Sequence, residues 1–179
     1  MAESDRHKTI KSEIYQGLIE KGYQGQTEYP FKNAYGHIVH RPDLLFSIKG
    51  QLVAIEIQCS PISRLDIQSR NLHFTQNHIA VLWVIGSNDQ NSTWTKYIAK
   101  HVHNDTLFYH HQKAVLRSVR LDNFFDTDTA TGSLNESESF IEVDELDFVL
   151  SPNRKFLTAQ LPEITDGMIE WMEMNMMLD

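Results

Sequence analysis

Apolar positions near the start of the chain recur with the period of an α-helix. Ile10, Ile14 and Leu18 stand four residues apart, so they share one face of a helix that the sequence predicts over residues 4–22. Either Ser4 or Asp5 can cap this helix, because the side-chain oxygen of each can accept from the first free backbone N–H groups. The chain therefore opens with an amphipathic helix that has one apolar face to bury.

Between residues 40 and 60 the apolar positions alternate with the period of a β-strand. Two such runs are separated by Lys49-Gly50, a pair typical of a tight hairpin turn. The alternation predicts one buried face, formed by Leu44, Phe46, Val53, Ile55 and Ile57. By the same alternation Cys59 lies on the buried side and is interpreted as a core residue.

The hairpin turn decides which polar residues face each other. If Ile48 and Gln51 flank a two-residue turn, Asp43 lies opposite Glu56; a four-residue loop keeps this register, whereas a three-residue loop shifts it by one. Opposed Cβ atoms lie about 4.5–5.5 Å apart, so the two carboxylates repel each other unless a cation lies between them. Because carboxylate oxygens suit Mg²⁺ or Mn²⁺, the sequence predicts a divalent metal site here.

Residues 60–86 add a helix and a buried strand. Ser60 is placed as the cap and Pro61 as the first helical residue of a helix ending near residue 77. The continuously apolar residues 79–85 predict a buried strand parallel to the preceding one. The helix is expected to bury Ile62, Leu65 and Leu72. The fold class is therefore α/β, with a mixed central sheet (antiparallel hairpin plus parallel strand) flanked by helices.

The rest of the chain is expected to complete this core and to add an acidic extension. Further elements are predicted at 27–32 (an edge strand), 92–104 (a helix), 106–109, 114–121 and 140–150 (strands) and 163–178 (a Met-rich helix with Trp171). We divide the chain into a core (1–121), an acidic Ser/Thr-rich linker (122–139) and a C-terminal strand and helix (140–179). The last part is expected to pack on the core or on a partner, such as a second copy of the chain.

Charge is distributed unevenly. The net charge is −8, but residues 1–120 hold 14 Lys and Arg against 10 Asp and Glu, so this part is +4, while residues 121–179 hold 2 against 14 and are −12. The basic part could meet phosphates and the acidic part could not. A single cysteine, the absence of a membrane-length apolar run and a polar start favour a cytoplasmic protein that binds no membrane.

A longer set of motifs resembles a known nuclease family. The motifs are Arg41-Pro-Asp43, then Ala54-Ile-Glu56-Ile-Gln58-Cys-Ser60-Pro-Ile-Ser63, then Arg70-x-x-x-Phe74. Over residues 1–86 they resemble the nuclease-like domain of the competence protein CoiA, within the PD-(D/E)XK superfamily. That resemblance implies a restriction-endonuclease-like core and metal-dependent hydrolysis of phosphodiester bonds, with DNA as the expected substrate.

The resemblance also implies roles for individual residues. Asp43 and Glu56 would hold Mg²⁺ or Mn²⁺, together with the Ile57 carbonyl. Gln58 stands where most of the superfamily has a lysine that orients the attacking water, and His7 is the candidate to replace that lysine. Nucleic-acid contacts are assigned to Arg41, Ser60, Arg64 and Arg70, and accessory roles to Glu3 and Glu28. Phe74 is expected to pack where the family has a tyrosine.

Several other polar residues are interpreted as structural or solvent-exposed. Glu3, His7 and Lys11 follow one another four residues apart along one face of the first helix. For Lys11 this face is interpreted as solvated and stabilised by side-chain pairs at that spacing. Glu28 could equally be a charged group on an exposed edge strand. Six histidines are interpreted as surface or loop residues and not as a zinc site: His37, His40, His101, His103, His110 and His111.

Three classes of function are consistent with the sequence. The first is a metal-dependent nuclease. The second is a catalytically inactive nuclease-fold module that binds nucleic acid or a protein partner. The third is an interaction protein that acts through its Met-rich helix and acidic segment. The paired carboxylates of the hairpin favour the nuclease.

Overall fold

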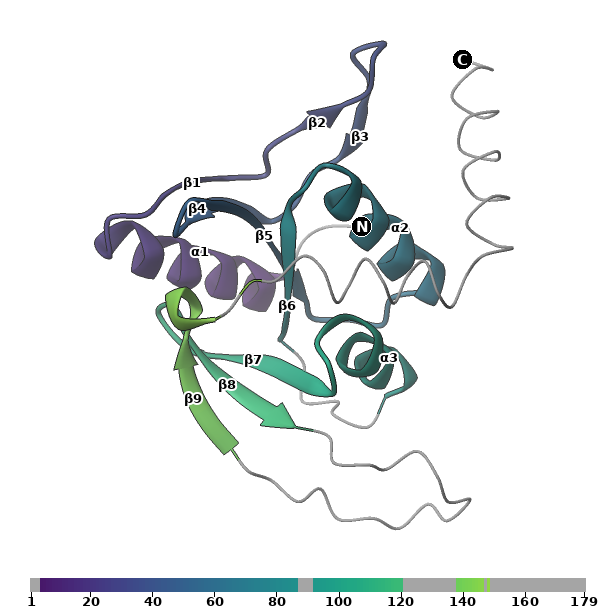
Figure 1. Cartoon of the computed structure of the whole chain (residues 1–179). Coiled ribbons are helices and arrows are strands. Elements are labelled where there is room, and N and C mark those ends of the chain that lie inside the picture. The colour runs from purple at the N-terminus through teal and green to yellow at the C-terminus, as the bar shows by residue number, and fades with distance from the viewer. Residues whose placement is uncertain (1–3, 87–91, 121–137, 147, 149–179) are drawn as a thin grey trace.

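The computed structural model describes residues 4–86, 92–120, 138–146 and 148, which form a mixed β-sheet between helices (Figure 1). Within these residues the helices are α1 (Asp5–Glu20), α2 (Arg64–Gln76) and α3 (Thr93–Val102), with a short 3₁₀ turn at Val143–Glu145. The strands of the main sheet are β1 (Gln24–Thr27), β4 (Leu44–Ile48), β5 (Gln51–Gln58), β6 (Ala80–Ile85), β7 (Thr106–Gln112), β8 (Val115–Arg120) and β9 (Glu138–Glu142). A small second sheet contains β2 (Phe31–Lys32) and β3 (Ile38–His40).

The main sheet combines parallel and antiparallel neighbours. Its order in the described residues is β1-β4-β5-β6-β7-β8-β9, in which β5, β6 and β7 run parallel and the other neighbours are antiparallel. The helix α2 connects β5 to β6 as the parallel crossover requires. The predicted α/β class and mixed sheet are confirmed.

The central hairpin has the predicted register. Leu44 pairs with Ile55, and Ile48 pairs with Gln51 across the two-residue turn. Both turn residues have positive φ angles, 50° at Lys49 and 81° at Gly50, which is the backbone of a type I′ turn. Extending this register by one residue places Asp43 opposite Glu56.

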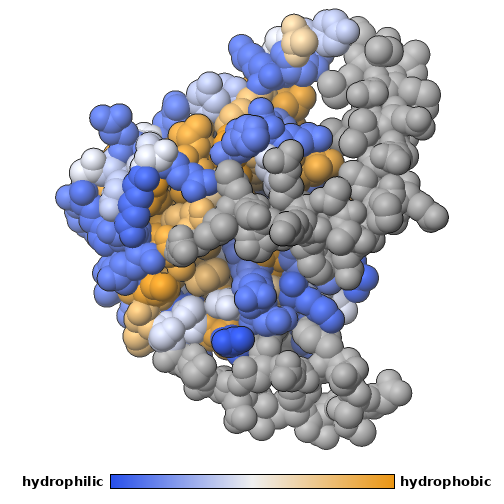
Figure 2. Space-filling view, in the orientation of Figure 1, coloured by the Kyte–Doolittle hydropathy of each residue, from blue (hydrophilic) through white to orange (hydrophobic). Residues whose placement is uncertain are grey.

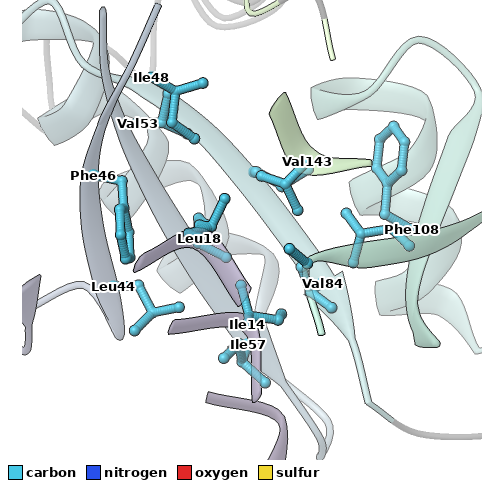
Figure 3. Close-up of a cluster of buried hydrophobic side chains, with 14 of the residues drawn as sticks. Ile14, Leu18, Leu44, Phe46, Ile48, Val53, Ile57, Val84, Phe108 and Val143 are labelled. Atoms are coloured by element: carbon cyan, nitrogen blue, oxygen red, sulfur yellow. The ribbon is translucent and has the colours of Figure 1, made fainter. Parts of the chain in front are cut away.

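One face of the sheet packs against α1. Ile14 and Leu18 of this helix enter the layer between the β4–β5 hairpin and Val84 of β6 (Figure 3). The predicted apolar hairpin face lies entirely in this cluster, with Leu44, Phe46, Val53, Ile55 and Ile57 all buried. Ser4 caps α1 as expected, accepting from the His7 backbone N–H at 3.2 Å. Cys59 is half-buried against the same cluster.

The other face of the hairpin is buried as well. Helices α2 and α3 cover it, and Leu45 and Ala54 lie in their apolar cluster with Phe74. The predicted helix around residues 92–104 is confirmed as α3, capped by Ser92. Because both sheet faces are covered, a polar residue such as Glu56 on this face is taken out of water and must find partners within the protein.

Three predicted elements differ from the structure. The helix α2 begins at Arg64 and not at Pro61, because Ser63 caps it: its Oγ accepts from the Asp66 N–H at 3.1 Å and donates to the Asp66 carboxylate at 2.6 Å. Of the three apolar residues expected inside, Leu65 is 60% exposed and Ile62 and Leu72 are half-buried, because the buried face of α2 carries Ile67, Asn71, Phe74 and Thr75. The C-terminal strand covers Glu138–Glu142, where it pairs with β8, and ends in the 3₁₀ turn, so it is displaced from 140–150.

The edge strand also lies earlier than predicted. It is β1 at Gln24–Thr27, not residues 27–32, and it pairs with β4. Its sequence Gln-Gly-Gln-Thr has no apolar alternation. What fits it to the sheet is Gly25, where an added Cβ would lie 2.4 Å from a ring carbon of Phe46.

Residues 29–40 leave the body of the protein as a separate arm. The strands β2 and β3 pair only with each other and are joined by a turn at Asn33–Gly36, so they project beyond the sheet and α2 (Figure 1). Figure 2 shows apolar surface on this arm, at the top of the view, as well as on the body.

The predicted Met-rich helix 163–178 and nearly all of the linker 122–139 lie outside the described residues. Among the residues that are described, no helix has the length and apolar character needed to cross a membrane.

Candidate active site

The candidate site lies where β4 begins and β5 ends, at the border between the two helical layers. Asp43 immediately precedes β4, and its Oδ2 accepts the backbone N–H of Ile57 at 2.8 Å. The same oxygen lies 3.2 Å from Nε2 of His7, on the first turn of α1. Both side chains are largely buried, 19% and 15% exposed. The Asp43 carboxylate therefore connects the first turn of α1 to the end of β5.

Glu56 is the most buried polar residue of the site. It is 1% exposed, and each of its carboxylate oxygens has a partner. Oε2 accepts from Arg70 on α2 at 2.7 Å, and Oε1 lies 2.8 Å from Nε2 of His40, the last residue of β3. A buried carboxylate needs a cation and hydrogen bonds to offset its lost hydration. Arg70 supplies the charge, and His40 supplies the second contact.

The position of Arg70 is set by buried neighbours. Its guanidinium lies over the ring of Trp83, 5.8 Å from the ring centre. The Trp83 indole N–H donates at 2.9 Å to Asn71, the residue that follows Arg70 on α2. Asp66 lies four residues before Arg70, a spacing that allows an ion pair within the helix, but Asp66 instead bonds Ser63. The helix therefore directs Arg70 towards Glu56.

Lys11 and Glu28 form a second charged pair beside Asp43. Their side chains meet at 2.7 Å, and Lys11 is only 12% exposed. The backbone N–H of Glu28 donates to the Asp43 carbonyl at 3.1 Å. The interpretation of Lys11 as a solvated residue is therefore wrong, because its partner comes from the segment after β1 and not from its own helix.

Other predicted site residues lie around this centre without joining it. The Gln58 amide donates to the Ser60 carbonyl at 2.6 Å. Arg64 lies over the ring of Tyr97 on α3, 5.5 Å from its centre. Arg41 is exposed between β3 and Asp43. Glu3 lies outside the described residues.

His40 was expected to be a surface or loop residue, and that expectation is wrong. Its side chain is 14% exposed, and its ring packs 5.0 Å from Phe74 as well as meeting Glu56. Strand alternation could not place it relative to Asp43, because Arg41-Pro42 interrupts the strand between them. Burial and the neighbouring His40 together lower the pKa of His73 on α2.

Two of the later histidines are also structural. His103 accepts the backbone N–H of Trp83 at 2.9 Å, and burial lowers its pKa to about 3. His110 lies 3.0 Å from Glu13 with a side chain 15% exposed, so it too is not a surface residue. Among the described residues no group of three or more His, Cys, Asp and Glu side chains is arranged to hold a metal ion, which gives no support to a zinc site.

The fold is consistent with a nuclease-like core: a mixed sheet whose central hairpin carries two carboxylates, and a following helix that brings an arginine to the second. The family model "Competence protein CoiA, nuclease-like domain" matches residues 3–129, and the chain belongs to this family. The resemblance drawn from the motifs is thus confirmed. No protein with a curated description matches the chain. Membership of a nuclease-like family suggests a nuclease.

Proposed function

We propose that the protein is a metal-dependent nuclease that hydrolyses phosphodiester bonds, with DNA as its expected substrate and Asp43 and Glu56 at the centre of the reaction. The observation that carries the proposal is that four polar side chains lie together although they come from distant parts of the chain. They are His7 on α1, Asp43 directly before β4, Glu56 on β5 and Arg70 on α2. Asp43 contacts His7 and Glu56 contacts Arg70. The hairpin register, extended by one residue from the Leu44–Ile55 pair, places Asp43 opposite Glu56.

The donor set fits a hard divalent cation. Mg²⁺ and Mn²⁺ are bound through one or two carboxylates, and waters and substrate phosphate oxygens complete the shell, so a cluster of three protein ligands is not required. A carboxylate has about four lone-pair sites, and the contacts of Glu56 described above use one site on each oxygen. Asp43, Glu56 and the Ile57 carbonyl would hold the ion. When bound, it would lower the pKa of a water and stabilise charge on the phosphate.

The side chains around the carboxylates have distinct tasks in this proposal. Because the Asp43 carboxylate accepts, His7 donates its Nε2–H to it, and the task of taking a proton from a water would fall to its Nδ1. Gln58 can orient a water through its amide once it leaves the Ser60 carbonyl. Arg70, held beside Glu56, can exchange part of its contact for a phosphate oxygen, because its side chain is 35% exposed.

Cleavage of plasmid and oligonucleotide DNA in Mg²⁺ or Mn²⁺ tests the proposal. Asp43→Asn keeps an oxygen that can accept the Ile57 N–H, so it removes the charge and leaves the strand contact in place. Asp43→Asn and Glu56→Gln should abolish cleavage while the far-ultraviolet circular dichroism stays that of the wild type. Asp66→Asn, a matched change on the exposed start of α2, should cleave as the wild type does. Cleavage that survives Asp43→Asn would refute the assignment.

A second candidate is a catalytically inactive module that binds nucleic acid. It is favoured by the way the described residues satisfy one another: Arg70 already balances Glu56, and the Gln58 amide is bonded to Ser60. This candidate predicts no cleavage with either ion, together with nucleic-acid binding that Asp43→Asn does not weaken.

A further inference from the structure

The β2–β3 arm combines exposed apolar side chains with positive charge. The arm carries four of the exposed large hydrophobic residues in the described part of the chain: Tyr29, Tyr35, Ile38 and Val39. Tyr35, at the turn, is 67% exposed. Residues 29–40 contain Lys32 and two histidines and no Asp or Glu, and the exposed Arg41 follows directly, although the chain as a whole has a net charge of −8. The arm is therefore a locally basic, aromatic surface on an acidic protein.

Both ends of the arm are rooted in the candidate active site. At its start, the Glu28 backbone N–H donates to the Asp43 carbonyl at 3.1 Å. At its end, His40 contacts Glu56 at 2.8 Å. A ligand lying along the arm would therefore be led to the two carboxylates.

The base of the arm is held by packing, whereas its outer part is free. The ring of Phe31 on β2 packs edge-on against His73 and Phe74 of α2, with ring centres 5.3 and 6.3 Å apart. Residues 34–39 beyond it are exposed. At about 3.3 Å per residue the turn at Tyr35 lies roughly 15 Å from His40, so a bound strand of a few nucleotides could run from the turn to the site.

We propose that the β2–β3 arm binds the nucleic-acid strand that enters the site, with Tyr35 stacking on a base and Lys32 contacting a phosphate. Stacking on aromatic side chains and pairing of lysine with phosphate are the two interactions by which proteins hold single strands without reading their sequence. The two ends of the arm meet Asp43 and Glu56, which favours a strand led to these carboxylates over a second copy of the chain. The inference rests on the proposed function for its ligand but not on turnover.

Binding of a fluorescein-labelled single strand, and of its duplex, measured by anisotropy, tests the proposal. All variants are made in the Asp43→Asn background so that no substrate is cleaved. Tyr35→Ala should weaken binding about tenfold, as expected for the loss of one stacked base. Lys32→Ala should reduce the slope of log affinity against log salt by about 1. Matched controls at the far side of the sheet, Phe140→Ala and Lys113→Ala, should bind as the background does.

The outcomes separate this inference from the proposed function. If Tyr35→Ala weakens binding but the wild type cleaves nothing, the arm proposal stands and the nuclease proposal fails. If the Tyr35 and Lys32 variants bind like their controls, or if the background binds no nucleic acid, the arm proposal is overturned. A Tyr35→Ala variant with a lower solution mass and unchanged nucleic-acid binding would assign the arm to self-association, and that result would overturn it too.

Discussion

Arg70→Met removes the cation that balances the most deeply buried carboxylate of the site. The Glu56 side chain is 2% exposed and meets Arg70 at 2.7 Å. Removing one partner of a buried ion pair costs about 3–5 kcal/mol, because the other charge is left uncompensated. Since Arg70 keeps 35% of its side-chain surface in water, we place the loss at the lower end, about 3 kcal/mol. Met retains much of the apolar contact with Trp83, so the change reports on charge and not on packing.

Urea unfolding of the wild type, Arg70→Met, Glu56→Gln and the double variant measures the coupling between Arg70 and Glu56. If Glu56 carries the charge that Arg70 balances, Glu56→Gln in the Arg70→Met background should recover at least half of the loss, since no buried charge then lacks a partner. Arg64→Met is the matched control on the same helix. Arg64 stacks on Tyr97 without an ion pair to Glu56, so its replacement should cost less than about 1 kcal/mol.

The reasoning would be refuted by an Arg70→Met loss below about 0.5 kcal/mol, the range of ordinary surface substitutions. Equal losses for Arg70→Met and Arg64→Met would refute it as well. Additive effects of Glu56→Gln and Arg70→Met would show that the two residues do not act as a pair.

Three further predictions concern the scaffold and are measured by urea unfolding. Burial lowers the pKa of His103 to about 3 from 6.5, so the unfolded chain binds this proton first as the pH falls. The folded state should therefore lose about 2 kcal/mol of stability by pH 5, and this loss should be absent in His103→Gln. A His103→Gln variant with the same pH dependence as the wild type would contradict it. Gly17→Ala should destabilise by roughly 1–3 kcal/mol despite the higher helix propensity of alanine, because the new Cβ would lie 2.8 Å from the backbone of Ala114; a gain in stability would contradict this close approach. Lys49→Asn should stabilise by about 0.5 kcal/mol, because Asn tolerates the positive φ of the type I′ turn better than Lys; a loss would contradict that account.

The hairpin could be predicted because local rules determine it. Alternation assigned Phe46 and Ile55 to the core, and the Lys49-Gly50 turn fixed the pairing of Ile48 with Gln51. These inferences need only the period of a strand and the length of a turn. The buried strand β6 could be predicted from its continuous apolar run, and its parallel pairing with β5 from the helix that lies between the two strands in sequence.

The partners of the carboxylates could not be predicted, because they come from segments distant in sequence. His40 contacts Glu56 from the end of β3, and Arg41-Pro42 separates β3 from β4. Because strand periodicity does not continue through these two residues, it could not predict the contact. Lys11 is buried by Glu28, a residue beyond the helix. The start of α2 offered two serines, and the reciprocal bonds of Ser63 with Asp66 favoured the later one.

Calorimetry of Mn²⁺ and Mg²⁺ binding, with wild type and Asp43→Asn compared on samples whose fold has been verified, tests the central claim most directly. The account predicts binding by the wild type, strong weakening in Asp43→Asn and in Glu56→Gln, and unchanged binding in Asp66→Asn. DNA cleavage by the same samples should be lost in the same two variants. Equal ion binding by wild type and Asp43→Asn, or no binding by either with DNA present, would contradict the claim that these two carboxylates form a metal-dependent nuclease site.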